Sequence, residues 1–152
     1  MQVTRAGEYA IIGLIYLARQ PVNRTVMIDE ISEAEGVPKS FLAKIFQSLA
    51  KAGFVRSIRG AHGGFSLAKP AREISLLQVF QCVEAVFALQ KCVTSDPECV
   101  VSDARLGNCT LCAVFGEAQH RVNEVFARTS LADLLQPKSP AARQAKAPAA
   151  LN

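Results

Sequence analysis

The chain has 152 residues, half of them hydrophobic, and its formal net charge is +4. This length fits one domain with at most an arm, and no apolar run reaches the roughly 18–20 residues of a membrane-spanning helix. The apolar stretch near the start is broken by Gly13 and lacks a small-residue cleavage site, so it does not match a secretory signal. We therefore expect a cytoplasmic protein that enters no membrane and keeps its five cysteines reduced.

The first part of the chain predicts two helices and then a sharp break. Thr4 can cap a first helix that ends before Pro21. Asp29 opens a short second helix that runs through Glu35. Residues 36–38, which are Gly-Val-Pro, then interrupt the chain because glycine and proline both disfavour a continuing helix.

A third helix is predicted from Lys39 to Ala52, with Gly53 as its C-terminal cap. Apolar residues at helical spacing predict a buried face made of Phe41, Leu42, Ile45, Phe46 and Leu49. The opposite face carries polar and basic side chains, namely Lys39, Ser40, Lys44, Gln47, Ser48 and Lys51. This helix is therefore expected to present a basic face to solvent.

Two short strands are predicted next, at about residues 54–58 and 64–68, with a glycine-rich hairpin tip between them. The order helix, break, helix, hairpin is typical of a winged helix-turn-helix. We expect a mainly α-helical fold with a two-stranded wing, and we assign this unit to residues 1–72.

Positive charge is concentrated in the same region. Residues 39–72 hold seven Lys and Arg and no Asp or Glu. Residues 1–72 hold ten basic and five acidic side chains, whereas residues 73–152 hold seven and eight. A surface that carries only positive charge can be an ordinary solvated surface. On a helix-turn-helix, such a surface indicates that the protein binds a polyanion, and we expect double-stranded DNA.

The amino-terminal residues of the second helix of a helix-turn-helix enter the major groove of DNA. Ser40 and Lys44 are the candidates for hydrogen bonds to base edges, and Lys39 and Lys51 for phosphate contacts. The wing adds Arg59 at its base and His62 at its tip. Neighbouring glycines would let this backbone approach a narrow minor groove, where arginine is favoured.

The second half of the chain predicts helices around an irregular segment. Ser75 and Gln78 form a capping box for a helix at about 75–89. Residues 90–109 are irregular, and a long helix follows at about 110–129. Its apolar residues alternate at spacings of 4 and 3, which is a heptad seam made of Leu111, Phe115, Ala118, Val122 and Val125.

This seam can pack within the chain or against a two-fold partner, and we expect a dimerisation helix. Ser130 caps a last short helix that runs through Leu135. We assign residues 73–135 to the cysteine loop and dimerisation helices, and residues 136–152 to a disordered tail that is rich in Ala, Pro and Lys.

Four cysteines follow one another in the pattern Cys92-x6-Cys99-x9-Cys109-x2-Cys112. Thiolates suit iron–sulfur clusters and zinc. Structural zinc sites usually have two pairs of closely spaced cysteines or histidines. This segment has one such pair, Cys109-x2-Cys112. An iron–sulfur cluster is therefore favoured, and zinc is the alternative. Cys82 lies among valines and is expected to be a buried small apolar residue.

Other activities find less support in the sequence. Cys109-Thr-Leu-Cys112 lacks the βαβ context of a thioredoxin-like site. There is no nucleophile–base pair and no phosphate loop among the residues, which include only two histidines, so we expect no enzyme. A regulator that senses through zinc or thiol oxidation without a cluster remains the alternative function.

Several segments together resemble the dimeric winged-helix regulators of the IscR and NsrR type, the Rrf family. The resemblance runs from about Met1 to Leu135 and is carried by Thr4–Ile11, Ile28–Ser32, Ser40–Phe46, Ala52–Gly60 and Gly63–Ala68. It implies a homodimer that binds a partly palindromic operator, mostly as a repressor, and that responds to redox state, nitric oxide or iron.

The resemblance also implies a ligand set. Cys92, Cys99 and Cys109 fall at the three cysteine positions of the cluster-binding members. Cys112 falls where the IscR type has a histidine ligand, and Glu8 falls where the NsrR type has a carboxylate that reaches across from the partner subunit. Cys112 is favoured because it is local and soft, and four local ligands favour a 2Fe–2S over a 4Fe–4S cluster.

Overall fold

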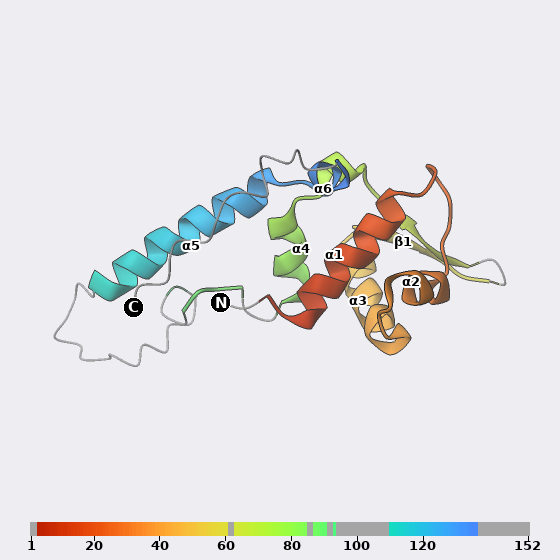
Figure 1. Cartoon of the computed structure of the whole chain (residues 1–152), viewed down its shortest axis with the longest axis horizontal. Helices are drawn as coiled ribbons and strands as arrows, with labels where there is room; N and C mark the ends of the chain where they lie inside the picture. The colour runs from red at the N-terminus through yellow and green to blue at the C-terminus, as the bar shows by residue number, and fades with distance from the viewer. Residues whose placement is uncertain (1–2, 61–62, 85–86, 91–92, 94–109, 137–152) are drawn as a thin grey trace.

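The computed structural model describes residues 3–60, 63–84, 87–90, 93 and 110–136. It contains a helical head with a two-stranded wing at one side and a long helix that extends from the other side (Figure 1). The elements are α1 (Arg5–Ala18), α2 (Ile28–Glu35), α3 (Lys39–Lys51), β1 (Val55–Ile58), β2 (Gly64–Leu67), the 3-10 turn η1 (Ala71–Glu73), α4 (Leu76–Val83), α5 (Thr110–Arg128) and α6 (Leu131–Leu135). The predicted mainly helical winged fold is confirmed.

The predicted first helix and its cap are confirmed. The Thr4 side chain accepts a hydrogen bond from the Gly7 backbone N–H at 3.3 Å, which satisfies one of the free amides of the first turn of α1. The helix buries Ala10, Leu14 and Leu17 in the centre of the head. Helices α3, α4 and α6 all pack against α1, so α1 is the central element of the core.

The turn between α2 and α3 has the predicted break. Helix α2 begins at Ile28, one residue earlier than predicted, with Met27 as its cap, so Asp29 lies inside the first turn. Gly36 adopts φ 65° and ψ 28°, a left-handed conformation that other residues adopt only with strain. The Ser32 hydroxyl donates to the Val37 carbonyl at 2.6 Å and holds the turn closed.

Four of the five residues predicted on the inner face of α3 are buried: Leu42, Ile45, Phe46 and Leu49. The prediction for Phe41 is wrong, because this side chain is 53 % exposed. Phe41 lies at the edge of the apolar stripe, where its ring meets the ring of Tyr9 edge-on with centroids 6.3 Å apart.

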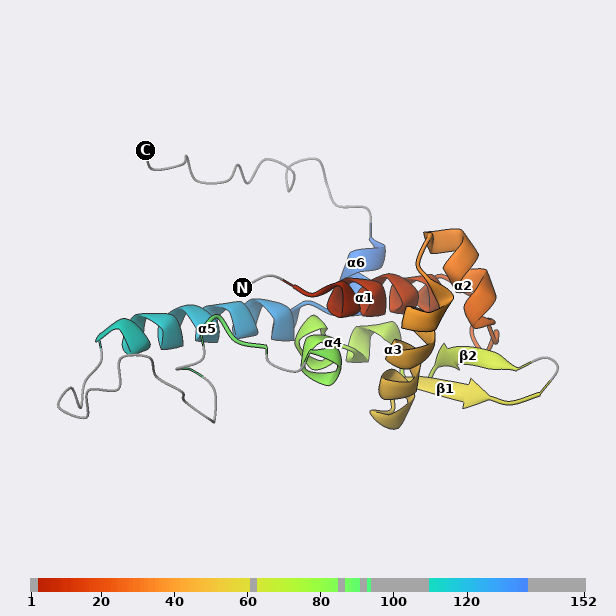
Figure 2. The same ribbon diagram turned by 90° about the horizontal axis from the view of Figure 1, so that it is seen from below.

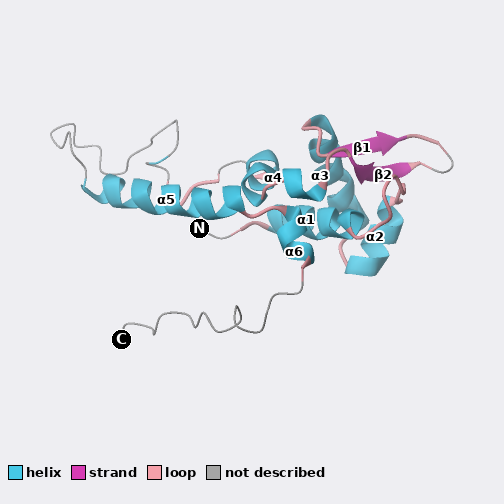
Figure 3. Ribbon diagram, turned by 90° about the horizontal axis from the view of Figure 1, so that it is seen from above, coloured by secondary structure: helices cyan, strands magenta, loops and turns pink. Residues whose placement is uncertain are grey.

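The wing is an antiparallel pair in which Val55 faces Leu67 and Ile58 faces Gly64. Its bounds agree with the prediction to within one residue at each end. Val26 extends the pairing, because its N–H and carbonyl exchange hydrogen bonds of 2.9 and 2.8 Å with Phe65. Figure 3 shows the two strands of this sheet in magenta, next to α2 and α3.

Helix α4 has the predicted capping box between Ser75 and Gln78 but is shorter than predicted. It ends at Val83, and Glu84 adopts an extended conformation with φ −90° and ψ 130°. The Glu84 carboxylate accepts hydrogen bonds from the backbone N–H and the hydroxyl of Thr4, at 3.1 and 2.8 Å. These bonds hold the end of α4 to the start of α1 and favour the observed stop.

Helix α5 follows the predicted bounds closely and extends away from the head, as Figure 2 shows from below. Within one chain the two ends of its predicted seam are not covered, because Leu111 is 54 % and Val125 is 53 % exposed, whereas Phe115, Ala118 and Val122 are partly buried. Helix α6 then returns to the head, where Leu131 is fully buried. The predicted cap of α6 is confirmed by the reciprocal hydrogen bonds of Ser130 and Asp133, which lower the pKa of the Asp133 carboxyl.

No helix in the described ranges combines the length and apolar character needed to cross a membrane. The predicted tail lies outside the described residues apart from Gln136, and the irregular segment before α5 lies outside them almost entirely.

Candidate nucleic-acid interface and cysteine site

The predicted DNA-contacting residues of α3 lie on its outer face. Lys39, Ser40, Lys44 and Lys51 are all exposed, whereas the opposite side of the helix is packed into the core. The core therefore fixes how α3 is rotated about its axis. This arrangement leaves the basic face open to a partner along the length of the helix.

Lys39 is engaged in a contact that the sequence did not reveal. Its Nζ lies 2.5 Å from the Asp29 carboxylate of α2, and both side chains are more than half exposed. An exposed ion pair of this kind contributes about 0–1 kcal/mol. Lys39 can therefore exchange Asp29 for another anion at little cost.

The other basic side chains of this surface carry unbalanced charge. Among the residues that the structure describes, no carboxylate forms an ion pair with Lys44, Lys51 or Arg59. Lys69 differs, because its ammonium lies 5.4 Å from the centre of the Phe54 ring in a cation–π contact at the base of the wing. The positive face is thus concentrated on α3 and on the end of β1.

The wing presents Arg59 directly after β1, where it is exposed. Arg56 also points to solvent from β1, and it is a basic residue of this surface that the sequence analysis did not single out as a contact. His62 lies outside the described residues, so its predicted role at the tip stays a prediction.

The predicted cysteine ligands fall mostly outside the described part of the chain. Cys92, Cys99 and Cys109 lie beyond it, whereas Cys112 is half-buried in the first turn of α5. Within the described ranges, no three His, Cys, Asp or Glu side chains form a group that could hold a metal ion. Glu8 is exposed in the first turn of α1.

Cys82 is half-buried rather than fully buried as predicted. It packs against the core, and its Sγ lies 3.7 Å from the Ser48 carbonyl, to which it donates. Burial raises the pKa of the Cys82 thiol. A thiol with a raised pKa is a poor nucleophile at neutral pH, which agrees with a structural role.

The segment that leads toward Cys92 is held by contacts that the sequence did not predict. Phe87 stacks on Phe80 of α4 with centroids 5.3 Å apart and meets Phe126 of α5 at 5.8 Å. The Leu89 N–H donates to Gln119 of α5 at 2.6 Å. Gln119 is buried, and its side chain is satisfied by this contact, as buried polar groups in proteins usually are.

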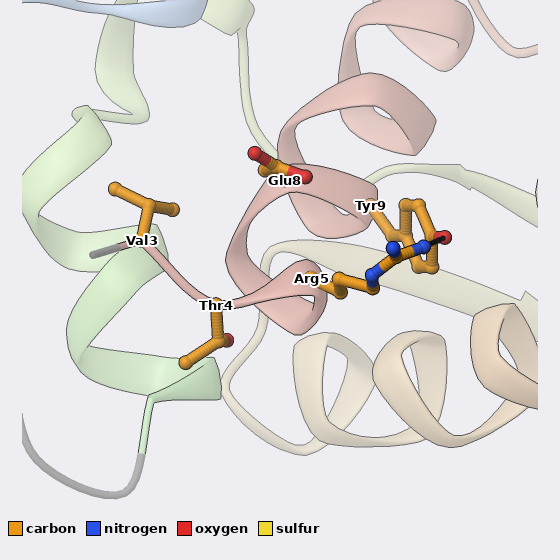
Figure 4. A pocket seen from close by; sticks show the side chains of 5 residues that line it. All are labelled: Val3, Thr4, Arg5, Glu8 and Tyr9. Carbon is orange, nitrogen blue, oxygen red and sulfur yellow. Dashed lines mark hydrogen bonds between the residues drawn. The ribbon is translucent and has the colours of Figure 1, made fainter.

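An open hollow of about 590 Å³ lies at the start of α1. Figure 4 shows its lining residues, which are Val3, Thr4, Arg5, Glu8 and Tyr9. Arg5 and Tyr9 project together toward α3, and Glu8 projects from another side of the helix.

A family model described as "Rrf2: Iron-dependent Transcriptional regulator" matches residues 3–137 of the chain. The chain is 34 % identical over 137 residues to Protein aau3 of Rhizobium meliloti (strain 1021), a match that covers 90 % of this chain and 86 % of that protein.

Solved structures share this fold. The global cysteine regulator CymR of B. subtilis has a TM-score of 0.70 at 23 % identity, over 89 % of this chain and 96 % of CymR. IscR of T. potens has a TM-score of 0.71 at 24 % identity, over 93 % of this chain and 90 % of that one. At these identities the likeness establishes the winged-helix architecture.

Proposed function

Because this chain belongs to the Rrf2 family of transcriptional regulators, we propose that it acts in the cytoplasm as a homodimeric repressor of a partly palindromic operator. We further propose that an iron–sulfur cluster held by the cysteine segment controls this binding. The family consists of DNA-binding regulators, so the chain is not an enzyme.

One observation supports direct DNA binding most strongly. The exposed face of α3 carries Lys44 and Lys51 and the residue after β1 is Arg59, and no described carboxylate neutralises these three charges. Such a surface gains free energy by displacing the counterions of DNA phosphates. Ser40 and Lys44 would read base edges, Lys39 and Lys51 would bind phosphates, and Arg59 and His62 would act from the wing.

Replacing Arg59 with alanine is expected to weaken operator binding by about 1–3 kcal/mol, or roughly 5- to 150-fold, because a groove-facing arginine is lost. The operator would first be selected from a random-sequence duplex library with the wild-type protein. Fluorescence anisotropy at several salt concentrations then measures affinity.

Arg19→Ala is the matched control, since it removes the same charge from the far end of α1, where Arg19 is exposed. The control should bind like the wild type. Equal losses in both variants, or wild-type binding that is insensitive to salt, would contradict a specific role for the wing.

The exposed apolar face of α5 supports the homodimer. Leu111, Val114 and Val125 are each more than half exposed and belong to one helix that extends beyond the head. A helix with such a face gains stability by packing against a second copy. A packed pair of α5 helices would set the distance between the two DNA-binding heads.

The cysteine spacing and the iron dependence named for the family support a cluster. Cys112 lies in the amino-terminal turn of α5, where the helix dipole stabilises a thiolate. Cys92, Cys99 and Cys109 would complete a local set that favours 2Fe–2S over 4Fe–4S. Glu8, exposed at the hollow, is the alternative fourth ligand from the partner subunit.

A mechanical link between this segment and the head supports control of DNA binding. The segment before Cys92 is held by Phe87 and Leu89 to α4 and α5, and Glu84 holds the same stretch to Thr4 at the start of α1. Binding or loss of a cluster at these cysteines would change these contacts. A differential free energy of a few kcal/mol is enough to shift the population of DNA-binding arrangements.

Protein purified without oxygen is expected to be coloured, with iron and acid-labile sulfide in near-stoichiometric amounts. Cys99→Ser should abolish the visible absorption, because a cluster that loses a thiolate ligand is not retained. Absorption spectra with iron and sulfide assays check this, and electron paramagnetic resonance of the reduced protein identifies the cluster type.

Cys82→Ser is the matched control and should keep the absorption, since Cys82 packs against the core near Ser48. Loss of colour in Cys112→Ser but not in Glu8→Gln assigns the fourth ligand to Cys112, and the reverse assigns it to Glu8. The protein could instead be colourless and fail to take up a cluster on reconstitution. If it then holds zinc, or if peroxide changes its DNA affinity, the zinc or thiol-oxidation hypothesis replaces the cluster hypothesis.

A further inference from the structure

Arg5 and Tyr9 form a polar pair on the first turns of α1. The Arg5 guanidinium donates through Nη1 to the Tyr9 hydroxyl at 3.4 Å. Both side chains line the hollow at the start of the helix and project together in Figure 4. The pair thus offers several N–H donors and a hydroxyl at one place on the surface.

The charge of Arg5 is not explained by the stability of α1. A helix carries partial positive charge at its amino-terminus, so an arginine as first residue is disfavoured there. No carboxylate of the described residues forms an ion pair with Arg5. Glu8 is the acidic residue of the same turn, but it projects away from the pair. This cation is therefore available to an external anion.

The pair is continuous with the proposed DNA-binding face. Tyr9 meets Phe41 of α3 edge-on, with ring planes at 77°. Phe41 directly follows Ser40 in the first turn of α3, and more than half of Phe41 is exposed. The Tyr9–Phe41 contact and the hydrogen bond from Arg5 to Tyr9 therefore place Arg5 near the first turn of α3, the end that would enter the major groove.

We infer that Arg5 and Tyr9 bind a backbone phosphate of the DNA next to the groove that α3 occupies. The guanidinium is a planar fork that matches two phosphate oxygens, and the Tyr9 hydroxyl can donate to the same group. The contact would carry no sequence information and would set the register of the head on the duplex. This inference rests on the proposed DNA binding and extends it from α3 and the wing to α1.

Arg5→Ala is expected to lower affinity about tenfold for the selected operator and for random duplexes alike, because a phosphate contact is independent of sequence. The slope of log affinity against log salt should fall by about 0.9, the value for one phosphate. Tyr9→Phe keeps the ring contact with Phe41 and should lose a smaller part of the affinity. Anisotropy titrations at several salt concentrations measure all of these.

Two further variants make the result decisive. Arg5→Gln removes the charge but keeps most of the side-chain length, and it should lower the salt slope as Arg5→Ala does, which protects the test if Arg5→Ala folds poorly. Arg19→Ala, at the opposite end of α1, should keep both affinity and slope.

Unchanged affinity and unchanged slope in Arg5→Ala and Arg5→Gln, with a wild type that binds DNA, would overturn this inference and leave the proposed function intact. A selective loss for the operator alone would also overturn it, because that loss indicates a base contact. Absence of salt-dependent DNA binding by the wild type would overturn both.

Discussion

Replacing Phe46 with alanine is expected to lower the free energy of unfolding by about 3–5 kcal/mol, the usual cost of removing a buried phenyl ring. Phe46 is fully buried. Its ring meets Phe65 of the wing edge-on with centroids 5.0 Å apart. On the other side it packs so closely under α1 that a Cβ added at Gly13 would lie 2.6 Å from it. One side chain therefore joins α1, α3 and β2, and its loss leaves a cavity that these three elements cannot all close.

Equilibrium unfolding in urea, followed by circular dichroism, measures this effect. Phe41→Ala is the matched control, because it removes the same ring from the same helix at a position that is 53 % exposed. We expect the control to cost about 1 kcal/mol, the worth of an edge-on aromatic contact. Similar losses for the two variants would contradict the burial pattern of α3.

Replacing Val125 with glutamate is expected to convert the proposed dimer to a monomer and to reduce operator affinity at least about 100-fold. Val125 lies on the apolar face of α5 and is 53 % exposed in the single chain. In a two-fold pair the substitution occurs twice, and each unpaired buried carboxylate costs several kcal/mol. A monomer would then bind one half-site and lose the gain from simultaneous engagement of both heads.

Analytical ultracentrifugation and anisotropy with the selected operator measure the two effects. Ala127→Glu is the matched control, because it adds the same charge two residues away at an exposed position on another face of α5. That variant should stay dimeric. A wild type that is monomeric at micromolar concentration, or a Val125→Glu variant that stays dimeric, would contradict the proposed role of this face.

Local sequence signals were enough for most of the fold. The cap of α1 at Thr4, the break at residues 36–38, the wing, the capping box at Ser75 and the cap at Ser130 were all predicted and are confirmed. These features depend on hydrogen bonds and backbone preferences within a few residues. The basic face of α3 was predicted in the same way, because helical periodicity fixes which side chains oppose the core.

The errors occur where distant segments meet. Helix α4 ends at Val83, earlier than predicted, and the next residue, Glu84, bonds to Thr4, which lies 80 positions earlier in the chain. Phe41 is exposed because α1 covers the neighbouring part of α3 and leaves this ring at its edge. Neither contact leaves a periodic signal, so the pattern of a single segment could not reveal them.

By itself, the sequence determined which segments are helices and strands, where each one begins to within about a residue, and that positive charge gathers on a winged helix-turn-helix. Only the tertiary structure decided that Tyr9 bonds to Arg5 and packs on Phe41, that Lys39 pairs with Asp29, and that the two ends of the α5 seam stay exposed within one chain. The physical reason is the separation along the chain between the residues that interact. Secondary structure follows from neighbours along the chain, whereas a binding surface depends on packing between elements that the sequence keeps far apart.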